Sequence, residues 1–231
     1  MAIFEFKKFD LEIDKNVFPI TTDAVLLASW VELNSSDLVL EIGIGSGIIS
    51  FICKFKFSNI EIHGIDINSH AIKTAEFNMD NLGLDGMTFS SISFQEFESK
   101  TRYDHIICNP PYFANSLLPL SQKMKEAKHR ENFDFGKFAS FCNRNINDNG
   151  SISVILPYDQ ENELSYNMCK FGFSPSRICK IKHCDNSNIK FVLLEYQKPY
   201  RKLKIETQAL YIQDSNIVSN WHADLIKEVL K

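Results

Sequence analysis

Asn109, Pro110, Pro111 and Tyr112 are the residues whose types and order point most directly to chemistry. The two prolines stiffen the chain and donate no backbone hydrogen bond. The side-chain oxygen of Asn109 and the carbonyl of Pro110 are two acceptors that can hold both protons of one amino group. Acceptors held off the plane of a delocalised amino group draw its nitrogen toward tetrahedral geometry, which requires positioning rather than a strong base. Tyr112 offers a flat face on which a planar ring can stack.

A second motif is the glycine-rich turn from Glu41 to Gly47, which follows an apolar run and opens a helical segment. Gly43, Gly45 and Gly47 permit a tight turn and let a ligand approach the backbone. Their spacing differs from the Gly-x-Gly-x-x-Gly of dinucleotide-binding folds, and Asp66 ends the next apolar run, where a carboxylate can face a ribose. The spacing therefore argues against a dinucleotide as the ligand of this turn, and Glu41 stands shortly before the first glycine.

Alternating strand-like and helix-like segments must position these two motifs. Five apolar runs predict strands of parallel type at 38–42, 60–66, 87–92, 103–108 and 151–156. Helical periodicity predicts helices at 48–54, 69–82, 135–146 and 161–171, with Ser69 as the N-cap and Gly83 as the C-terminal stop of the second. This alternation is typical of a doubly wound α/β sheet.

The ends of the chain differ from this pattern. Residues 177–182 and 189–197 are separated only by a short polar turn, which predicts an antiparallel hairpin. Residues 24–31 predict a helix before the first strand, capped by Thr22 or Asp23. We expect one domain over residues 1–231, with a lead-in and helix (1–36), a catalytic core (37–198), and a C-terminal arm and helix (199–231). The arm is expected to be irregular or strand-like, with its helix at 222–230.

Composition limits the class of protein. The chain has 231 residues, is 44% hydrophobic and 23% charged, and carries a formal net charge of -4, which argues against a large nucleic-acid footprint. Its six cysteines form no Cys-x-x-Cys pair, so we expect reduced, buried thiols and no metal site. Neither a signal-peptide core nor a membrane-length apolar stretch is present in the sequence. We expect a cytoplasmic protein and a monomer.

Taken together, the motifs resemble those of amino-group methyltransferases that act on adenine, guanine or protein glutamine; the shared residues are Glu41, Gly43, Gly45, Gly47, Asp66 and Asn109 to Tyr112. Narrower cues make the chain similar to the bacterial tRNA (adenine-N6)-methyltransferases that modify adenosine 37 of valine tRNA. These cues are Phe6-Lys7-x-Phe9, Thr22 to Leu27, and Ala127-Lys128-His129. The similarity runs over nearly the whole chain.

The resemblance implies a class I fold dependent on S-adenosylmethionine (SAM), Rossmann-like, with a seven-stranded, mostly parallel sheet that ends in an antiparallel hairpin. It implies methyl transfer to N6 of a tRNA adenosine, with Asn109, Pro110, Pro111 and Tyr112 at the reacting nitrogen. The implied cofactor-binding residues are Thr22, Asp23, Glu41, Gly43, Gly45, Gly47, Asp66, Ile67, Ser93, Phe94 and Asn109. Ser93 stands where the family usually has an acidic residue, and Lys128 stands where it usually has arginine.

Other acceptors and classes remain open at this point. A glutamine amide in a protein and N2 of guanine in ribosomal RNA are also planar nitrogens, so the tetrapeptide does not separate them from adenine. A SAM-binding or RNA-binding module without catalysis is the alternative outside the enzymes. Two basic segments, 123–130 and 198–204, are candidates for RNA contact or ordinary solvated surfaces.

Overall fold

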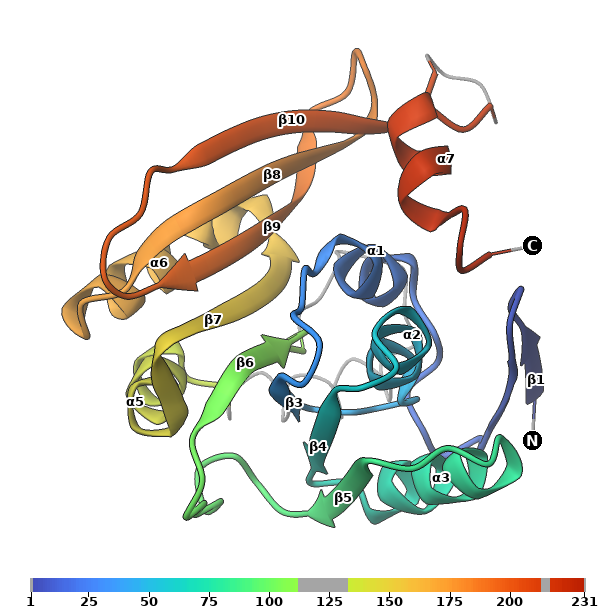
Figure 1. Ribbon diagram of the computed structural model, residues 1–231. Coiled ribbons are helices and arrows are strands. Elements are labelled where there is room, and N and C mark those ends of the chain that lie inside the picture. Colours follow the sequence, from blue (N-terminus) through green and yellow to red (C-terminus); the bar gives the residue numbers. More distant parts are fainter. Residues whose placement is uncertain (1, 112–132, 213–216, 231) are drawn as a thin grey trace, which may run out of the picture.

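The computed structural model describes residues 2–111, 133–212 and 217–230 (Figure 1). Its strands are β1 (Ala2–Glu5), β2 (Asp10–Ile13), β3 (Leu38–Ile42), β4 (Glu61–Asp66), β5 (Met87–Ser91), β6 (Tyr103–Cys108), β7 (Ile146–Pro157), β8 (Ser174–Cys184), β9 (Ile189–Gln197) and β10 (Lys204–Tyr211). Its helices are α1 (Thr22–Trp30), α2 (Ile48–Lys56), α3 (Ser69–Asn81), α5 (Phe135–Asn145), α6 (Glu161–Lys170) and α7 (Asn220–Ile226), with a short 3-10 turn, η1 (Tyr158–Gln160).

The main sheet has the strand order β10-β8-β9-β7-β6-β3-β4-β5, which Figure 1 shows from top to bottom. The five strands from β7 to β5 are parallel, as predicted. β9 lies antiparallel between β7 and β8, so the predicted C-terminal hairpin is also confirmed. Chain order reverses between β3 and β6, and ligands of such sheets bind outside the carboxyl ends of the strands at this point.

The number of strands differs from the expected seven. β10 pairs in parallel with β8, from Lys204 opposite Arg177 to Tyr211 opposite Cys184, and makes the main sheet eight-stranded. The arm after residue 198 is therefore partly a regular strand. Its first four residues are exposed and mostly polar, so they lack the apolar run that marks a buried strand.

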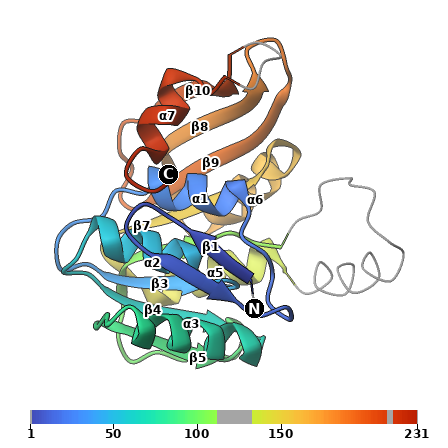
Figure 2. The same ribbon diagram turned by 90° about the vertical axis from the view of Figure 1, so that its right-hand side faces the viewer.

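A second sheet was not predicted at all. β1 and β2 form a two-stranded antiparallel ribbon, drawn in dark blue in Figure 2. All four residues of β1 are exposed, so its sequence has no buried face to reveal it. Asn78 of α3 holds the ribbon in place, because its side chain accepts from Glu12 N at 2.9 Å and donates to Glu12 O at 2.8 Å.

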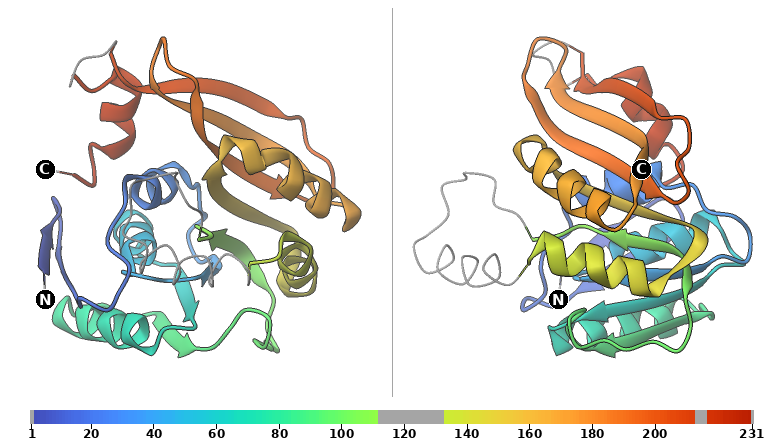
Figure 3. Two further views of the ribbon diagram at one scale, coloured as in Figure 1. Left: turned by 180° about the vertical axis from the view of Figure 1, so that it is seen from behind. Right: turned by 90° about the vertical axis from the view of Figure 1, so that its left-hand side faces the viewer.

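Helices cover both faces of the main sheet. One apolar cluster contains residues of α1, α2 and α3, and the other contains residues of α5 and α6. The right-hand view of Figure 3 shows yellow-green α5 and gold α6 together in front of the sheet, with blue α1 and α2 behind it. The predicted α/β class is confirmed.

Two predicted helix caps are wrong. α1 begins at Thr22 with Thr21 as its N-cap, and no side chain caps it, so neither Thr22 nor Asp23 has that role. α3 is capped by Asn68 rather than Ser69, because Asn68 Oδ1 accepts from His70 N at 3.0 Å. Gly83 does end α3 as predicted, with a φ of +60° that favours glycine.

Two further expectations concern the state of the cysteines and the presence of a membrane-spanning helix. All six cysteines are free thiols, and Cys169 alone among them is exposed. Burial raises the pKa of Cys53 to about 12, so this thiol stays protonated and inert at neutral pH. In the described parts of the chain, no helix is both long enough and apolar enough to cross a membrane.

Candidate active site

The glycine turn after β3 presents open backbone. Gly43, Gly45 and Gly47 have φ values of +75°, +51° and +79°, a region that L side chains rarely adopt. A Cβ added at Gly43 would meet no atom within 4 Å, and one at Gly45 would meet only Gly43 O at 4.0 Å. A Cβ at Gly47 would instead come within 2.8 Å of the Phe51 ring. The first two glycines therefore border free space, while the third packs against α2.

Asp66, at the end of β4, holds this turn. Its Oδ2 accepts from Gly45 N at 2.9 Å, and its Oδ1 accepts from Asn68 N at 2.8 Å. The half-buried carboxylate thus bridges the glycine turn and the start of α3. A carboxylate oxygen has more than one lone pair, so these bonds do not prevent a ribose hydroxyl from donating to the same group. Ile67 beside it is 58% exposed, which is unusual for a large apolar side chain at the rim of a site.

Glu41 lies beneath the turn on β3 and is almost fully buried. The Ser50 hydroxyl of α2 donates to its Oε2, whereas its Oε1 is buried and has no hydrogen-bond partner among the described residues. Burial raises the pKa of Glu41 to about 8, and the negative charge of Asp66 acts in the same direction. The carboxyl group is therefore mostly protonated at neutral pH, unless a cation reaches Oε1.

Asn109 follows β6 on the neighbouring strand. Ile42 pairs with Cys108, so Gly43 and Asn109 each directly follow one of two paired residues. The side-chain oxygen of Asn109 is buried and has no hydrogen-bond partner in the described part of the chain. A buried amide oxygen without a partner costs free energy, about 1–3 kcal/mol, which a donor from a bound molecule would recover. Pro110 next to it is buried and Pro111 is exposed.

Ser93 and Phe94 form the turn after β5, next to Asp66, since Ile92 N donates to Asp66 O at 2.9 Å. The Ser93 hydroxyl accepts from Gln95 N at 3.2 Å. Phe94 is 9% exposed and packs against other rings, those of Phe133, Phe138 and Phe141. Both side chains thus have internal partners, and their predicted contact with a cofactor adenine stays a prediction.

Thr22 and Asp23 lie in the first turn of α1, where Thr22 is exposed and Asp23 is half-buried. The segment that leads into α1 is tied to the site, because Asn68 Nδ2 donates to Asn16 O at 3.0 Å. Figure 2 shows this dark blue segment on the side of the molecule where β6 ends. Asn68, which caps α3, contacts Asp66 and anchors this segment, was missed from the sequence, although an asparagine before a helix is a recognisable capping signal.

Several predicted residues lie outside the described parts of the chain. These are Tyr112 and the basic residues of segment 123–130. The other basic segment, 198–204, is described. Gln197, the last residue of β9, pairs with Ser151, which pairs with His105 near the start of β6, so this segment begins toward the amino-terminal end of β6, away from Asn109. Lys198 Nζ there donates to Asn143 Oδ1 at 2.6 Å and lies over the Phe173 ring, which favours a structural role.

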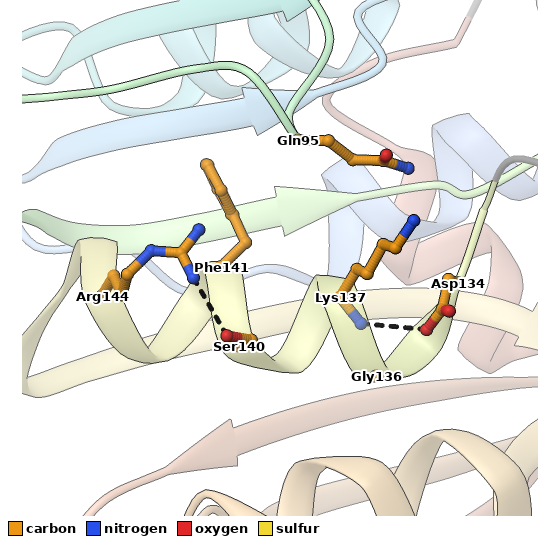
Figure 4. Close-up of a pocket in the computed structure, with 7 residues that line it drawn as sticks. All are labelled: Gln95, Asp134, Gly136, Lys137, Ser140, Phe141 and Arg144. Atoms are coloured by element: carbon orange, nitrogen blue, oxygen red, sulfur yellow. Dashed lines mark hydrogen bonds between the residues drawn. The ribbon is translucent and has the colours of Figure 1, made fainter.

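A hollow of about 510 Å³ lies between α5 and the turn after β5, which contains Ser93 and Phe94 (Figure 4). Gln95 and Lys137 extend toward one another across it, while Arg144 donates to Ser140 Oγ at 2.9 Å. Its described lining contains neither a glycine of the turn nor Asp66 or Asn109. The hollow is therefore a neighbour of the site rather than its centre.

An eight-stranded doubly wound sheet, an open glycine turn held by an aspartate, and a buried, unpartnered asparagine oxygen directly after the adjacent strand are the features expected of a class I SAM-dependent methyltransferase. The comparisons agree. The family model of the methyltransferase small domain matches residues 16–146. The chain belongs to this family.

Individual relatives extend the match. A tRNA1(Val) (adenine(37)-N6)-methyltransferase of Aliivibrio fischeri is 30% identical over 194 residues, covering 83% of this chain and 82% of the relative. A protein of the same name from Flavobacterium psychrophilum is 28% identical over 230 residues, 97% of each chain. Among solved structures, a predicted O-methyltransferase from Agrobacterium tumefaciens has a TM-score of 0.72 at 17% identity, covering 90% of this chain and 96% of its own. That likeness supports the fold.

The cofactor is S-adenosylmethionine, and the residues present fit it. This molecule carries no phosphate, so it needs open backbone rather than a phosphate-binding loop, and Gly43 and Gly45 provide that opening. It carries a ribose and an ammonium group; Asp66, which holds the turn, is a carboxylate of the kind that binds a ribose, and Glu41 beneath the turn has a buried Oε1 without a partner among the described residues.

Proposed function

We propose that this chain methylates N6 of adenosine 37 in tRNA1(Val), acting as a single methyltransferase domain and a monomer in the cytoplasm. The observation that carries the proposal is the buried, unpartnered Oδ1 of Asn109 beside the glycine turn. The names of the relatives supply the acceptor, because an asparagine acceptor alone suits any planar amino group.

The proposed roles of the residues at the acceptor follow from their hydrogen-bonding capacity. Asn109 Oδ1 accepts one N6 proton and the Pro110 carbonyl accepts the other. Holding both protons off the ring plane reduces delocalisation of the nitrogen lone pair and aims it at the donor. Tyr112 supplies a ring for stacking the adenine, which must first leave the stack of the RNA. Bound SAM supplies the electrophilic methyl group on a sulfonium.

The proposed cofactor contacts come from the described loops. Gly43, Gly45 and Gly47 let the cofactor approach the backbone, and Asp66 accepts from the ribose hydroxyls. Glu41, with Thr22 and Asp23 at the start of α1, faces the methionine end. The exposed side chain of Ile67 and the turn of Ser93 and Phe94 border the adenine. These assignments rest on where the elements end and on the unpartnered Oε1 of Glu41 among the described residues.

The test is methyl transfer from labelled SAM to tRNA1(Val) transcripts, followed by nucleoside analysis. We expect N6-methyladenosine from the wild type, none with a transcript carrying guanosine at position 37, and a loss of kcat of about 100-fold or more for Asn109→Ala. Transfer to guanosine, or to a glutamine amide in a protein extract, would overturn the choice of acceptor. Cofactor binding without transfer to any acceptor would favour a non-catalytic module.

A further inference from the structure

Beyond the methyl-transfer site, a row of aromatic and lysine side chains continues along the same edge of the sheet. We define the carboxyl-edge strip as Tyr158, Lys180, Lys182, Lys190 and Phe191. The strands beyond Asn109 follow in the order β6-β7-β9-β8 (Figure 1). Tyr158 directly follows β7, Lys190 and Phe191 begin β9, and both remaining lysines lie in β8.

The register of the strands gives the position of the strip along the strand direction, relative to the end of β6. Cys108, which precedes Asn109, pairs with Val154, and β7 continues from there to Pro157, which pairs with Phe191. Phe191 pairs in turn with Ile181, between the two lysines of β8. Lys180 pairs with Val192, which pairs with Leu156, two positions beyond Val154, and the other residues of the strip lie farther out still. The whole strip therefore lies beyond the end of β6. Adjacent strands are about 4.8 Å apart, so β8 lies roughly 14 Å from the strand that ends at Asn109.

Two of the lysines lie over aromatic rings. Lys180 Nζ is 5.1 Å from the centre of the Tyr158 ring and 3.4 Å from its hydroxyl oxygen. Lys190 Nζ is 5.1 Å from the centre of the Phe191 ring. Tyr158 is 37% exposed and Lys190 is exposed, so both can reach a molecule that lies on this edge. The arrangement places flat rings and positive charges side by side.

Within the described part of the chain, no ion pair neutralises the charges of the strip. Lys182 Nζ donates to the carbonyl of Asp185 at 3.2 Å, which leaves its charge unpaired. Asp159 and Asp185 are exposed and near in sequence, and neither carboxylate forms an ion pair with a lysine of the strip.

We propose that the carboxyl-edge strip binds the phosphodiester backbone of the RNA next to the target nucleotide. Lysine ammonium groups hold phosphates as point charges, and such contacts set the position of a nucleic acid rather than its sequence. Exposed tyrosine can stack an unpaired base, as in other proteins that bind single strands. The strip thus continues outward from Asn109, and the inference rests on the proposed RNA substrate.

The opposite edge offers a matched control. Arg201 and Lys202 are both exposed and follow β9 at the end of the sheet farthest from Asn109. Replacing both with alanine changes the net charge by the same amount as Lys180→Ala with Lys190→Ala. Both double variants lose two positive charges, at opposite ends of the strands, so an effect of net charge alone would be the same in the two.

The experiment measures the KM for tRNA1(Val), the KM for SAM, kcat, and the dependence of each on salt concentration. For the Lys180/Lys190 double variant we expect the KM for tRNA to rise roughly 5- to 20-fold and the salt dependence to become shallower, since two fewer phosphates are neutralised. The KM for SAM stays unchanged. Lys180→Arg with Lys190→Arg keeps the charges and restores wild-type behaviour within about two-fold.

Two outcomes would overturn the proposal. One is an equal rise in the KM for tRNA in the strip variant and in the Arg201/Lys202 control. The other is an unchanged salt dependence of the KM for tRNA in a strip variant whose thermal unfolding matches that of the wild type. If the alanine substitutions destabilise the β8–β9 hairpin, Lys180→Gln with Lys190→Gln is used instead. Absence of transfer to any tRNA by the wild type is a different result, because it rejects the proposed function itself.

Discussion

The backbone N–H of Gly45 donates to Oδ2 of Asp66 across 2.9 Å, linking the glycine turn to the end of the neighbouring strand. An ionised acceptor makes such a bond stronger than a neutral one. Because the other carboxylate oxygen accepts from Asn68 N, one side chain fixes two loops that border the open glycines. The conformation of the glycine turn therefore depends on this carboxylate even before a cofactor binds.

Asp66→Ala should weaken SAM binding more than Asp66→Asn. Alanine removes both acceptors, whereas asparagine keeps one side-chain oxygen; loss of a charge-assisted hydrogen bond costs about 1.5–3 kcal/mol. We expect the Kd for SAM to rise by at least ten-fold for alanine, measured by calorimetry. Asp85→Asn, on an exposed loop, is the control. An unchanged Kd in Asp66→Ala would refute the role of the carboxylate.

Gly43→Ala should impair cofactor binding, whereas Gly47→Ala should lower the stability of the fold. Both residues have positive φ, which costs an alanine about 1 kcal/mol. The new Cβ at Gly43 enters free space, so we expect a folded protein with impaired cofactor binding. The new Cβ at Gly47 meets the Phe51 ring at 2.8 Å, so we expect a loss of stability of roughly 2–4 kcal/mol. Thermal unfolding and SAM titration distinguish them, and matching defects in both variants would contradict the prediction.

Asn68→Ser should separate cofactor binding from stability. Serine can still cap α3, but it cannot donate to Asn16 O as Asn68 Nδ2 does. We expect the KM for SAM to rise several-fold with kcat nearly unchanged, because the segment leading into α1 loses its tie. Asn78→Ala removes the two bonds to Glu12 and should lower Tm without raising that KM. If both variants change Tm and the KM for SAM in the same way, the hydrogen bond from Asn68 to Asn16 has no specific role in cofactor binding.

Glu41 should make the stability of the protein without cofactor depend on pH. Its pKa is raised by burial from the ordinary 4.5 to about 8, so the folded state keeps a proton that the unfolded state releases between these values. Stability is therefore fully present below about pH 4.5 and is lost as the pH rises toward 8. Glu41→Gln keeps an acceptor for Ser50 and cannot ionise.

The measurement is Tm between pH 5 and 9 for the wild type and Glu41→Gln. We expect similar values near pH 5 and a higher Tm for the glutamine variant near pH 8 to 9. Parallel pH profiles would show that the carboxyl group is not desolvated as described. Addition of SAM should reduce the difference in Tm between the two proteins near pH 8 to 9, because the ammonium group of the cofactor favours the ionised carboxylate.

The strands that the sequence predicts best are those buried on both faces. β3 and β6 match their predicted bounds because each is a short, nearly continuous apolar run. β1 and β10 are largely exposed and carry no such run, so only their partners make them strands. The caps of α1 and α3 were misplaced by one residue or more, since adjacent polar residues are equally suited to that position from sequence alone.

In the site, too, some features follow from local sequence motifs, whereas others depend on contacts between distant segments. The proximity of Gly43 and Asn109 follows from the motif positions, because both motifs end neighbouring parallel strands. The missing partner of Asn109 Oδ1 and the bond from Asn68 to Asn16 depend on how distant segments pack. No local pattern encodes those contacts. The distribution of the lysines over the two edges of the sheet likewise required the register of β8 and β9.

The eighth strand has a consequence for how molecules of this protein meet one another. In the described structure, β10 covers one side of β8 and becomes the outermost strand of the main sheet. An uncovered strand is a template on which a second chain can pair, and charged side chains discourage such pairing. β10 brings Lys204 and Glu206 to that border, both exposed. We therefore expect these two charges to weaken pairing between the β10 strands of two molecules.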